Sequence, residues 1–302
     1  LMLVAGLGVL IGTSLAATSV HGASTAGVLE PLQITRLTAG DIAFGKLIAS
    51  WAVAVIALVT LLPFLVYAYF KAPWTIGEVL IMVVTILFVV LVTTAIGLAW
   101  SSIAARAIAS VALAHLTVGF FVLGSVVLFG VLTPLVSEDV PVTNIERDYS
   151  GVTDEDWADP AFSEENLPCV EITYNEYITN TEKLSWLLLI NPFVVVGETA
   201  PLVDVDALRD GKVGQGLFQY MHATVADTQL GPIPPKGMDW CADPYGESDN
   251  RWIERQYEAA GYERNPWVGL GLYSVLLVGS MWLTVNRLRV PYRTLRGGTR
   301  VA

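Results

Sequence analysis

Few side chains in this sequence have the types and spacing that catalysis or metal binding requires. The three histidines, His21, His115 and His222, are scattered along the chain and form no ligand cluster. No serine–histidine–aspartate set and no pair of carboxylates emerges from the spacing, so the sequence predicts no enzyme active site and no metal site. His115 lies within an apolar run, where a histidine marks either a functional position or a hydrogen bond between two helices.

One acidic stretch comes close to a calcium-binding loop. In "DEDWADPAFSEE", Asp154, Asp156 and Glu165 occupy the first, third and twelfth positions of such a loop. Ala158 replaces a ligand, however, and Asp159 stands where the loop requires a glycine. A solvated acidic surface is therefore the favoured interpretation.

The segment "GKVGQG", residues 211–216, has only a superficial likeness to a phosphate-binding loop. It lacks the G-x-x-x-x-G-K-[ST] spacing through which backbone N–H groups and a lysine hold phosphates. We interpret it as a solvated turn. The sequence therefore predicts that this chain neither hydrolyses ATP nor binds a cofactor itself.

The composition is that of a membrane protein. Of the 302 residues, 54% are hydrophobic and only 15% are charged, against about 25% charged residues in soluble domains. A membrane helix needs about 20 apolar residues. Five runs have about that length: 1–20, 47–70, 76–100, 107–135 and 267–285. Pro63 lies inside the second run and is expected to kink it.

Basic residues predict which side of the membrane each connection occupies. The tail "NRLRVPYRTLRGGTR" carries five arginines directly after the last run and is expected in the cytoplasm. Counting back places 136–265 outside and 21–46 inside. A sixth run, 184–196, has only 13 residues and is interrupted by Asn191 and Pro192. We therefore predict a re-entrant segment, at about 184–200, that does not cross.

The segment 136–265 is expected to be a water-soluble module. It carries 25 acidic and 8 basic residues, a net charge of −17, whereas the rest of the chain carries +6. Both cysteines, Cys169 and Cys241, lie within it. Two cysteines confined to the oxidising side of a membrane favour one disulfide over two free buried thiols.

The stretch "GVLEPLQITRLTAGDIAFGK", residues 27–46, is the only strongly patterned polar stretch in the first half of the chain. Its apolar face consists of Leu29, Leu32, Leu37 and Ile42, and its polar residues are Glu30, Gln33, Arg36 and Asp41. Thr38 is a candidate cap for the helix that enters the next apolar run. By periodicity alone, an amphipathic loop at the membrane interface is a sufficient interpretation.

The same stretch resembles the ABC-2 family of ABC exporter permeases, whose members carry a pattern close to G-T-L-E-L-L-L-T-T-P-L-S-R-R-E-I-L-L-G-K after their second span. The matching residues, in register and without a gap, are Gly27, Leu29, Glu30, Leu32, Thr35, Leu37, Ile42, Gly45 and Lys46. Thr38 stands at the family's serine and Asp41 at its glutamate, whereas Val28, Pro31 and Arg36 depart from the pattern. The segment "LLLINPF", Leu187–Phe193, resembles an L-N-P segment on the family's outer side.

The resemblance implies an all-α polytopic membrane protein, an ABC-2 (type V exporter-like) helical bundle with a large extracytoplasmic insertion before the last span. Residues 1–135 would hold membrane helices and a cytoplasmic coupling helix at about 23–45. Residues 136–265 would form the extracytoplasmic module, and 266–302 the last span and a basic cytoplasmic tail. The five runs would be the family's second to sixth spans, so we expect that the true N-terminus precedes Leu1.

The resemblance also implies partners and roles. The chain would be a permease subunit in a bacterial plasma membrane, paired with a second permease, identical or homologous, and with ATPase subunits that bind ATP and Mg²⁺. No nucleic acid is expected as a partner. The coupling helix would contact the ATPase through Leu29, Glu30, Leu32, Thr35, Arg36, Leu37, Gly45 and Lys46. The pathway between two permeases would be lined by Thr93, Thr94, Ser110, His115 and Thr117.

The alternative hypothesis is a non-transporting accessory or scaffold subunit of a larger membrane complex. Such a subunit would share the hydropathy of a permease. It would not need a cytoplasmic helix shaped to fit a groove on an ATPase.

Overall fold

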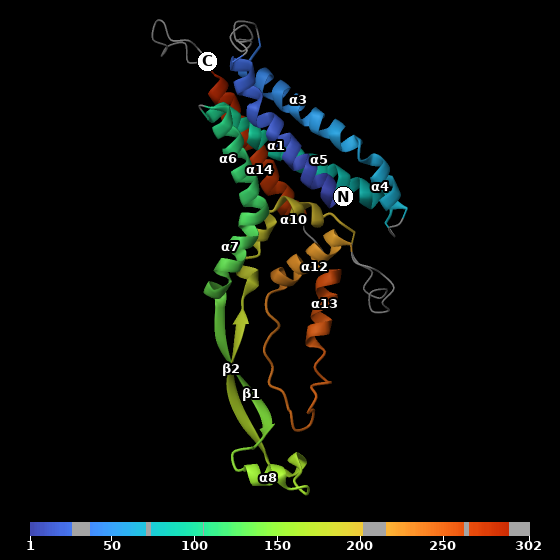
Figure 1. Ribbon diagram of the computed structural model, residues 1–302, viewed down its shortest axis with the longest axis vertical. Helices are drawn as coiled ribbons and strands as arrows, with labels where there is room; N and C mark the ends of the chain where they lie inside the picture. Colours follow the sequence, from blue (N-terminus) through green and yellow to red (C-terminus); the bar gives the residue numbers. More distant parts are fainter. Residues whose placement is uncertain (26–36, 71–73, 105, 202–215, 263–265, 290–302) are drawn as a thin grey trace.

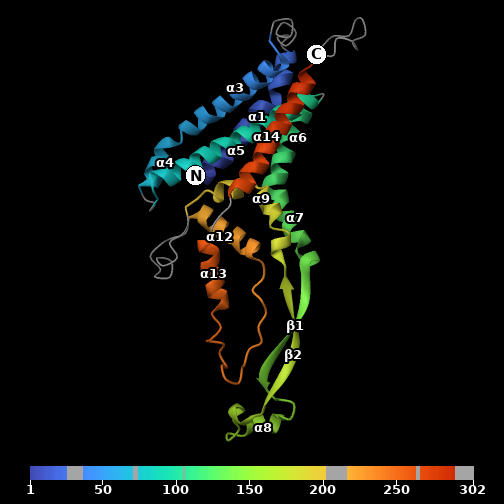
Figure 2. The same cartoon turned by 180° about the vertical axis from the view of Figure 1, so that it is seen from behind.

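The computed structural model describes residues 1–302 except 26–36, 71–73, 105, 202–215, 263–265 and 290–302. Its long helices form a tilted bundle, and a two-stranded arm projects from one end of that bundle (Figure 1). The view from behind shows the same separation between the bundle and the arm (Figure 2).

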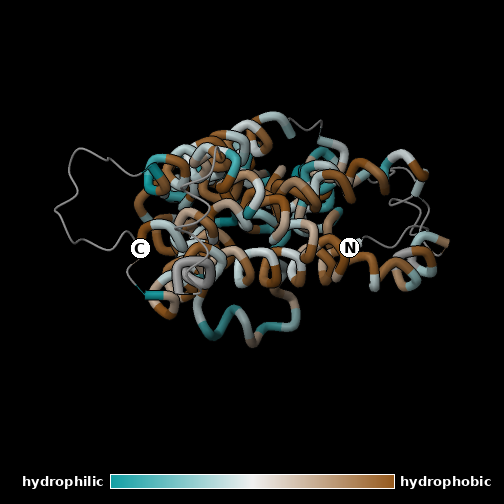
Figure 3. Tube along the Cα trace, turned by 90° about the horizontal axis from the view of Figure 1, so that it is seen from above, coloured by the Kyte–Doolittle hydropathy of each residue, from teal (hydrophilic) through white to brown (hydrophobic). Residues whose placement is uncertain are grey.

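Five of the described helical runs are long and apolar enough to cross a membrane, which confirms the five predicted spans. They are Met2–Val20, Ala39–Val59, Ile76–Ile103, Ala107–Val136 and Pro266–Leu288. The corresponding elements are α1 (Met2–Thr25), α3 (Ala39–Val59), α5 (Ile76–Ile103), the run that begins with α6 (Ala107–Gly119), and α14 (Pro266–Leu288). Seen from above, the coiled trace carries many hydrophobic residues, with hydrophilic ones interspersed among them (Figure 3).

The second span ends earlier than the sequence predicts. α3 ends at Val59, and Pro63 lies in the first turn of a separate helix, α4 (Leu62–Tyr69). The N–H groups of a first helical turn have no intrahelical acceptor, so a proline there sacrifices no hydrogen bond. The prediction that Pro63 kinks a continuous helix is therefore wrong, because this proline begins a new helix.

α5 lies at the centre of the bundle, and α1, α3, α6 and α14 all pack against it. The approach of α1 is closest where glycines stand. A Cβ atom on Gly12 of α1 would collide with the hydroxyl of Thr94, and one on Gly97 of α5 would lie 2.7 Å from the backbone oxygen of Thr13. Small residues at such positions let membrane helices gain van der Waals contact. The two helices therefore pack with their backbones close together.

The fourth span continues into the arm without a loop. α6 leads through a π-helical turn, η1 (Phe120–Gly124), to α7 (Ser125–Leu132) and a 3₁₀ turn, η2 (Thr133–Val136). The first strand begins at the next residue, Ser137, whose hydroxyl donates to the carbonyl oxygen of Thr133 at 2.9 Å. The arm is thus attached to the bundle through continuous secondary structure.

The arm consists of two antiparallel strands, β1 (Ser137–Arg147) and β2 (Cys169–Thr179). Pairing runs from Ser137 opposite Thr179 to Arg147 opposite Cys169. Each strand has 11 residues, which corresponds to a length of about 37 Å. The turn at the tip carries α8 (Asp154–Ala158) and a 3₁₀ turn, η3 (Glu164–Asn166).

The prediction of an all-α fold is wrong for this arm. β1 contains the β-branched residues Val140, Val142 and Thr143, and β2 also contains many β-branched and aromatic residues. Such residues favour a pleated strand because their side chains pack well between neighbours on its surface.

Short helices between the arm and the last span cover the arm-bearing end of the bundle. In chain order they are η4 (Thr181–Lys183), α9 (Trp186–Leu189), α10 (Pro192–Gly197), α12 (Leu217–Leu230) and α13 (Arg251–Gly261). The predicted re-entrant segment, about 184–200, contains α9 and α10, and α10 packs against α5 and α12. This segment does not reach the opposite end of the bundle (Figure 1). Its entry into a membrane leaflet stays a prediction.

Asn191 holds the re-entrant segment in place. Its side-chain oxygen accepts a hydrogen bond from the N–H of Phe193 at 2.9 Å and so caps α10. Its side-chain nitrogen donates to the carbonyl oxygen of Val122, within the π-helical turn, at 2.8 Å. Pro192 occupies the first turn of α10, where it sacrifices no hydrogen bond.

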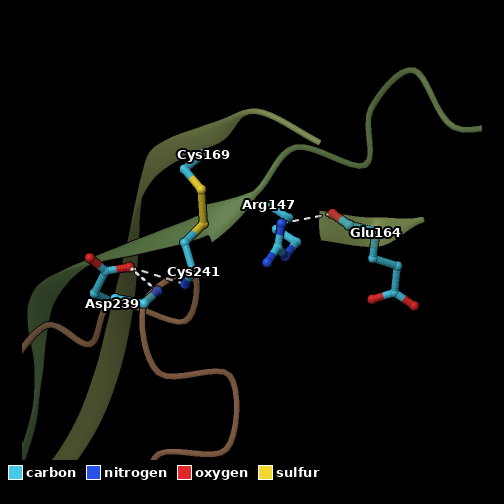
Figure 4. Close-up of a disulfide and its surroundings, with 6 residues drawn as sticks. Arg147, Glu164, Cys169, Asp239 and Cys241 are labelled. Carbon is cyan, nitrogen blue, oxygen red and sulfur yellow. Dashed lines mark hydrogen bonds between the residues drawn. A yellow bond between two sulfur atoms is a disulfide. The ribbon is translucent and has the colours of Figure 1, made fainter. Parts of the chain in front are cut away.

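The predicted disulfide is confirmed. Cys169, at the start of β2, is bonded to Cys241 in the segment that precedes α13 (Figure 4). This segment also runs beside β1. The N–H of Ile145 donates to the carbonyl oxygen of Met238, and the N–H of Trp240 donates to the carbonyl oxygen of Ile145, both at 2.9 Å. The disulfide and these backbone bonds together hold three segments side by side near the tip.

We expect Gly97→Ala to destabilise the bundle by about 1–3 kcal/mol, because the added methyl group would press on the backbone of α1. Gly271→Ala on α14 is the matched control, since no atom lies within 4 Å of a Cβ atom there. Thermal unfolding of both variants in detergent measures the difference. Equal midpoints for Gly97→Ala and Gly271→Ala would contradict the close contact.

Replacing both cysteines with serine should loosen the arm while leaving the bundle folded. The disulfide joins residues 72 positions apart, and closing such a loop stabilises by roughly 4 kcal/mol in the chain-entropy model. Limited proteolysis followed by mass spectrometry should show faster cleavage around residues 231–250 than in the unmodified chain. An unchanged cleavage pattern would show that the backbone bonds alone hold this segment.

Candidate functional site

The bundle end at which α14 ends carries the described part of the predicted coupling segment (Figure 1). Leu29, Glu30, Leu32, Thr35 and Arg36 lie outside the described residues, whereas Leu37, Gly45 and Lys46 are described. Leu37 is 47% exposed and immediately precedes the capping residue of α3. An apolar side chain is therefore presented at this end of the bundle.

Thr38 caps α3 as the sequence predicts. Its hydroxyl oxygen accepts a hydrogen bond from the N–H of Asp41 at 3.2 Å, and the carboxylate of Asp41 accepts from the N–H of Thr38 at 2.8 Å. This reciprocal pair is a capping box, which satisfies two donors that a helix start leaves without intrahelical partners. The start of α3 is therefore well defined.

Lys46 connects α3 to α1. Its ammonium group donates to the carbonyl oxygen of Ser19 at 2.7 Å. The side chain therefore anchors one helix on the other as well as holding a charge near the bundle end. Gly45 differs, because no atom lies within 4 Å of a Cβ atom placed on it. Packing among the described residues does not require a glycine there.

The five side chains predicted to line a pathway gather where α1, α5 and α6 meet. Thr93 and Thr94 on α5 are buried, and both hydroxyls donate to the carbonyl oxygen of Val90, at 3.1 and 2.6 Å. Ser110 on α6 is also buried and donates to the carbonyl oxygen of Ala17 on α1 at 2.7 Å. These hydroxyls are therefore engaged in contacts within this chain.

His115 and Thr117 link α6 to its neighbours. His115 Nδ1 lies 2.8 Å from the carbonyl oxygen of Val111, and we assign the hydrogen to Nδ1 because a carbonyl can only accept. Its other nitrogen, Nε2, lies 3.1 Å from the hydroxyl of Ser14 on α1. The hydroxyl of Thr117 accepts from the indole N–H of Trp100 on α5 at 2.9 Å. A pathway role for these side chains stays a prediction, since a pathway would run between two chains.

Sequence reasoning missed the partners of these residues. The sequence gives no sign that Ser14 contacts His115, although the G-x-x-x-G spacing of Gly8 and Gly12 signals a packing face on α1. Trp100 is expected from the sequence only as an aromatic residue at the membrane interface, and its bond to Thr117 is not. A buried pair in the outer part was missed as well. His222 Nδ1 of α12 lies 3.4 Å from an oxygen of Glu198, next to α10.

Within the described ranges, no group of three or more histidine, cysteine, aspartate or glutamate side chains could hold a metal ion. The calcium-like stretch is organised around a helix cap instead. The carboxylate of Asp156 accepts from the hydroxyl and the N–H of Thr153, which lowers the pKa of Asp156. Residues 211–215 of the phosphate-loop-like segment lie outside the described residues.

A family model described as ABC-2 family transporter protein matches residues 2–199. The match includes the first four spans, the arm, and the segment with α9 and α10. No curated protein and no solved structure matches the chain.

Ser110→Ala should lower the stability of the bundle by about 0.5–1.5 kcal/mol, because the carbonyl oxygen of Ala17 would lose its buried donor. Ser274→Ala is the matched control, since that hydroxyl is bonded to the carbonyl oxygen of Leu270 in its own helix. The midpoint of thermal unfolding should fall only for Ser110→Ala. A fall of the same size in both variants would contradict a specific link between α6 and α1.

Proposed function

Since this chain belongs to the ABC-2 transporter family, we propose that it is the permease subunit of an exporter powered by separate ATPase subunits. The family match is to a membrane transport component. ATP and Mg²⁺ would bind to the partner subunits, and this chain would convert their movement into a change in helix packing.

The observation that carries this proposal is the position of the connection between α1 and α3. α1 ends and α3 begins at the bundle end where α14 also ends, opposite the arm (Figure 1). In the proposal, this end faces the cytoplasm of a bacterium and the arm lies outside. The arginines that follow α14 support this orientation, because basic residues accumulate on the cytoplasmic side of membrane proteins.

A force on this connection would reach the bundle through contacts of described residues. The capping box of Thr38 and Asp41 couples the connection to the start of α3. Lys46 joins α3 to α1, and α1 is in close backbone contact with α5 at Gly97. Movement of the connection would therefore shift the central helix. The roles proposed for the connection are an apolar ridge of leucines and two orienting charges, Glu30 and Arg36.

A second permease, identical or homologous, is part of the proposal. In the fourth span, Ala107–Val136, only 11% of an apolar stretch of 18 residues is buried within this chain. The corresponding share in Ile76–Ile103 is 56%. The fourth span therefore leaves most of its surface to lipid or to another chain. The proposed pathway would run between the two permeases, near the contact that holds His115 and Ser110.

The purified complex should contain an ATPase chain with nucleotide-binding motifs in a fixed ratio to this chain. Intact-complex mass spectrometry measures that ratio and identifies a second permease.

Glu30→Lys should leave assembly of the bundle intact but uncouple ATP hydrolysis from transport, because a reversed charge would misalign the proposed contact. ATPase activity and transport are measured in the same proteoliposomes.

Asp154→Lys is the charge-matched control, because it makes the same charge change on α8, at the tip of the arm.

Gly45→Leu adds a test at a described position, since this chain leaves that space open. Gly45→Leu should fold normally and still weaken association with the ATPase. Recovery of the chain in stable complexes without any ATPase would favour the scaffold hypothesis instead.

A further inference from the structure

The tip of the arm contains a cavity that the proposed transport cycle does not use. Its volume is about 410 Å³, and it is lined by Glu146, Arg147, Tyr149, Glu164, Trp240 and Pro244. Ligand pockets in proteins span about 300–1,000 Å³. The cavity is a widely open depression on the surface, with room for a small group or for the end of a long side chain.

Three separate segments build this cavity. Glu146 and Arg147 end β1, Tyr149 and Glu164 come from the turn at the tip, and Trp240 comes from the segment tied down by the disulfide. Figure 4 shows the Arg147 side chain reaching the backbone oxygen of Glu164, at a distance of 2.8 Å. The arrangement is thus fixed by a disulfide and by bonds between segments.

The two carboxylates of the cavity are held in position by tyrosines. The hydroxyl of Tyr149 donates to Glu164 at 2.9 Å, and the hydroxyl of Tyr174 donates to Glu146 at 2.9 Å. These bonds raise the pKa of both tyrosines, so the phenols keep their protons and continue to donate. Each carboxylate can accept further hydrogen bonds, since its two oxygens offer about four lone-pair sites.

Aromatic rings form the apolar part of the wall. Tyr149 stacks against Trp157 with ring centroids 6.2 Å apart and planes 10° apart, and Trp157 in turn contacts the ring of Phe162. Tyr149 is nevertheless 44% exposed, and Trp240 is 36% exposed. The face of an aromatic ring carries negative electrostatic potential, which attracts cations.

The surroundings of the cavity are strongly acidic. Residues 146–168 contain eight acidic residues and one basic residue, Arg147. Three of the acidic residues, Asp154, Glu155 and Glu165, are exposed, and they lie near the lining residues Tyr149 and Glu164 in the sequence. A concentrated negative charge raises the local concentration of cations and repels anions. A ligand that extends beyond the cavity would therefore meet an acidic surface.

We propose that this cavity binds the ammonium or guanidinium group of a lysine or arginine side chain in a basic peptide. The ring faces of Tyr149 and Trp240 would contact the cation, and Glu146 and Glu164 would accept its N–H donors. Arg147 also lines the cavity and would repel the cation, so binding depends on the two carboxylates outweighing its single charge. A peptide is favoured over a free amine, because neighbouring basic residues of the peptide would lie on the acidic tip. This binding requires no ATPase, so it stands or fails independently of the transport proposal.

The test uses the full chain in nanodiscs of zwitterionic lipid, so that lipid charge does not compete for the peptide. Binding of a fluorescently labelled tetra-arginine peptide is measured by anisotropy at 0.15 M salt. Tyr149→Leu should raise the Kd about fivefold without changing the net charge. Tyr149→Phe keeps the ring and loses only the hydroxyl that holds Glu164, so it should weaken binding less than Tyr149→Leu does. An unlabelled tetra-glutamate peptide and a neutral tetrasaccharide should not compete.

Glu164→Gln and Glu165→Gln form the decisive pair, because both remove one charge and only Glu164 lines the cavity. Glu164→Gln should weaken binding several-fold more than Glu165→Gln. Equal effects of these two variants, together with unchanged binding by Tyr149→Leu, would overturn the proposal in favour of a diffuse acidic field. Absence of peptide binding, or competition by the tetrasaccharide, would overturn it as well. Unchanged thermal unfolding of each variant controls for folding.

Discussion

The close contact between α1 and α5 is the constraint on which the rest of the bundle depends. Glycines at 12 and 97 let the two backbones approach, and two carbonyl oxygens of α1 then accept hydrogen bonds from neighbouring helices. The carbonyl oxygen of Ser19 accepts from Lys46 of α3, and that of Ala17 accepts from Ser110 of α6. In apolar surroundings a polar group without a partner costs several kcal/mol, so these bonds specify one packing arrangement.

The arm is a continuation of the bundle more than a separate domain. The fourth span passes through a π-helical turn and then directly into β1. That turn also accepts the amide of Asn191, while the hydroxyl of Tyr273 in the last span donates to the carbonyl oxygen of Ile190 at 3.0 Å. The re-entrant segment thus joins the fourth and fifth spans. A change in the tilt of the fourth span would be carried outward to the tip of the arm.

The two ends of the molecule differ in chemistry as well as in position. The end at which α14 ends presents an exposed leucine, a capping box and a lysine anchor, which suits a contact with a moving partner in the proposed mechanism. The tip of the arm presents carboxylates and aromatic rings held by a disulfide and by hydrogen bonds. The proposed binding surface therefore lies at the opposite end of the molecule from the proposed ATPase contact (Figure 1).

Local patterns in the sequence were sufficient for several features. The five spans depend on length and hydropathy, the disulfide on two cysteines in one acidic segment, and the cap on Thr38 with Asp41 three residues later. Each of these depends on neighbouring residues or on composition alone. The break after Val59 was not predicted, because Pro63 is compatible both with the expected kink and with the first turn of a new helix.

Only the tertiary structure decided which distant groups meet. The pairing of β1 with β2 joins residues up to 42 positions apart, from Ser137 to Thr179, and no local periodicity specifies such a partner. The contact of Ser14 with His115 and the cavity between Tyr149 and Trp240 likewise require the path of the whole chain. Hydrophobic and polar patterns determine which face of an element is buried, whereas its partner depends on packing among all the elements.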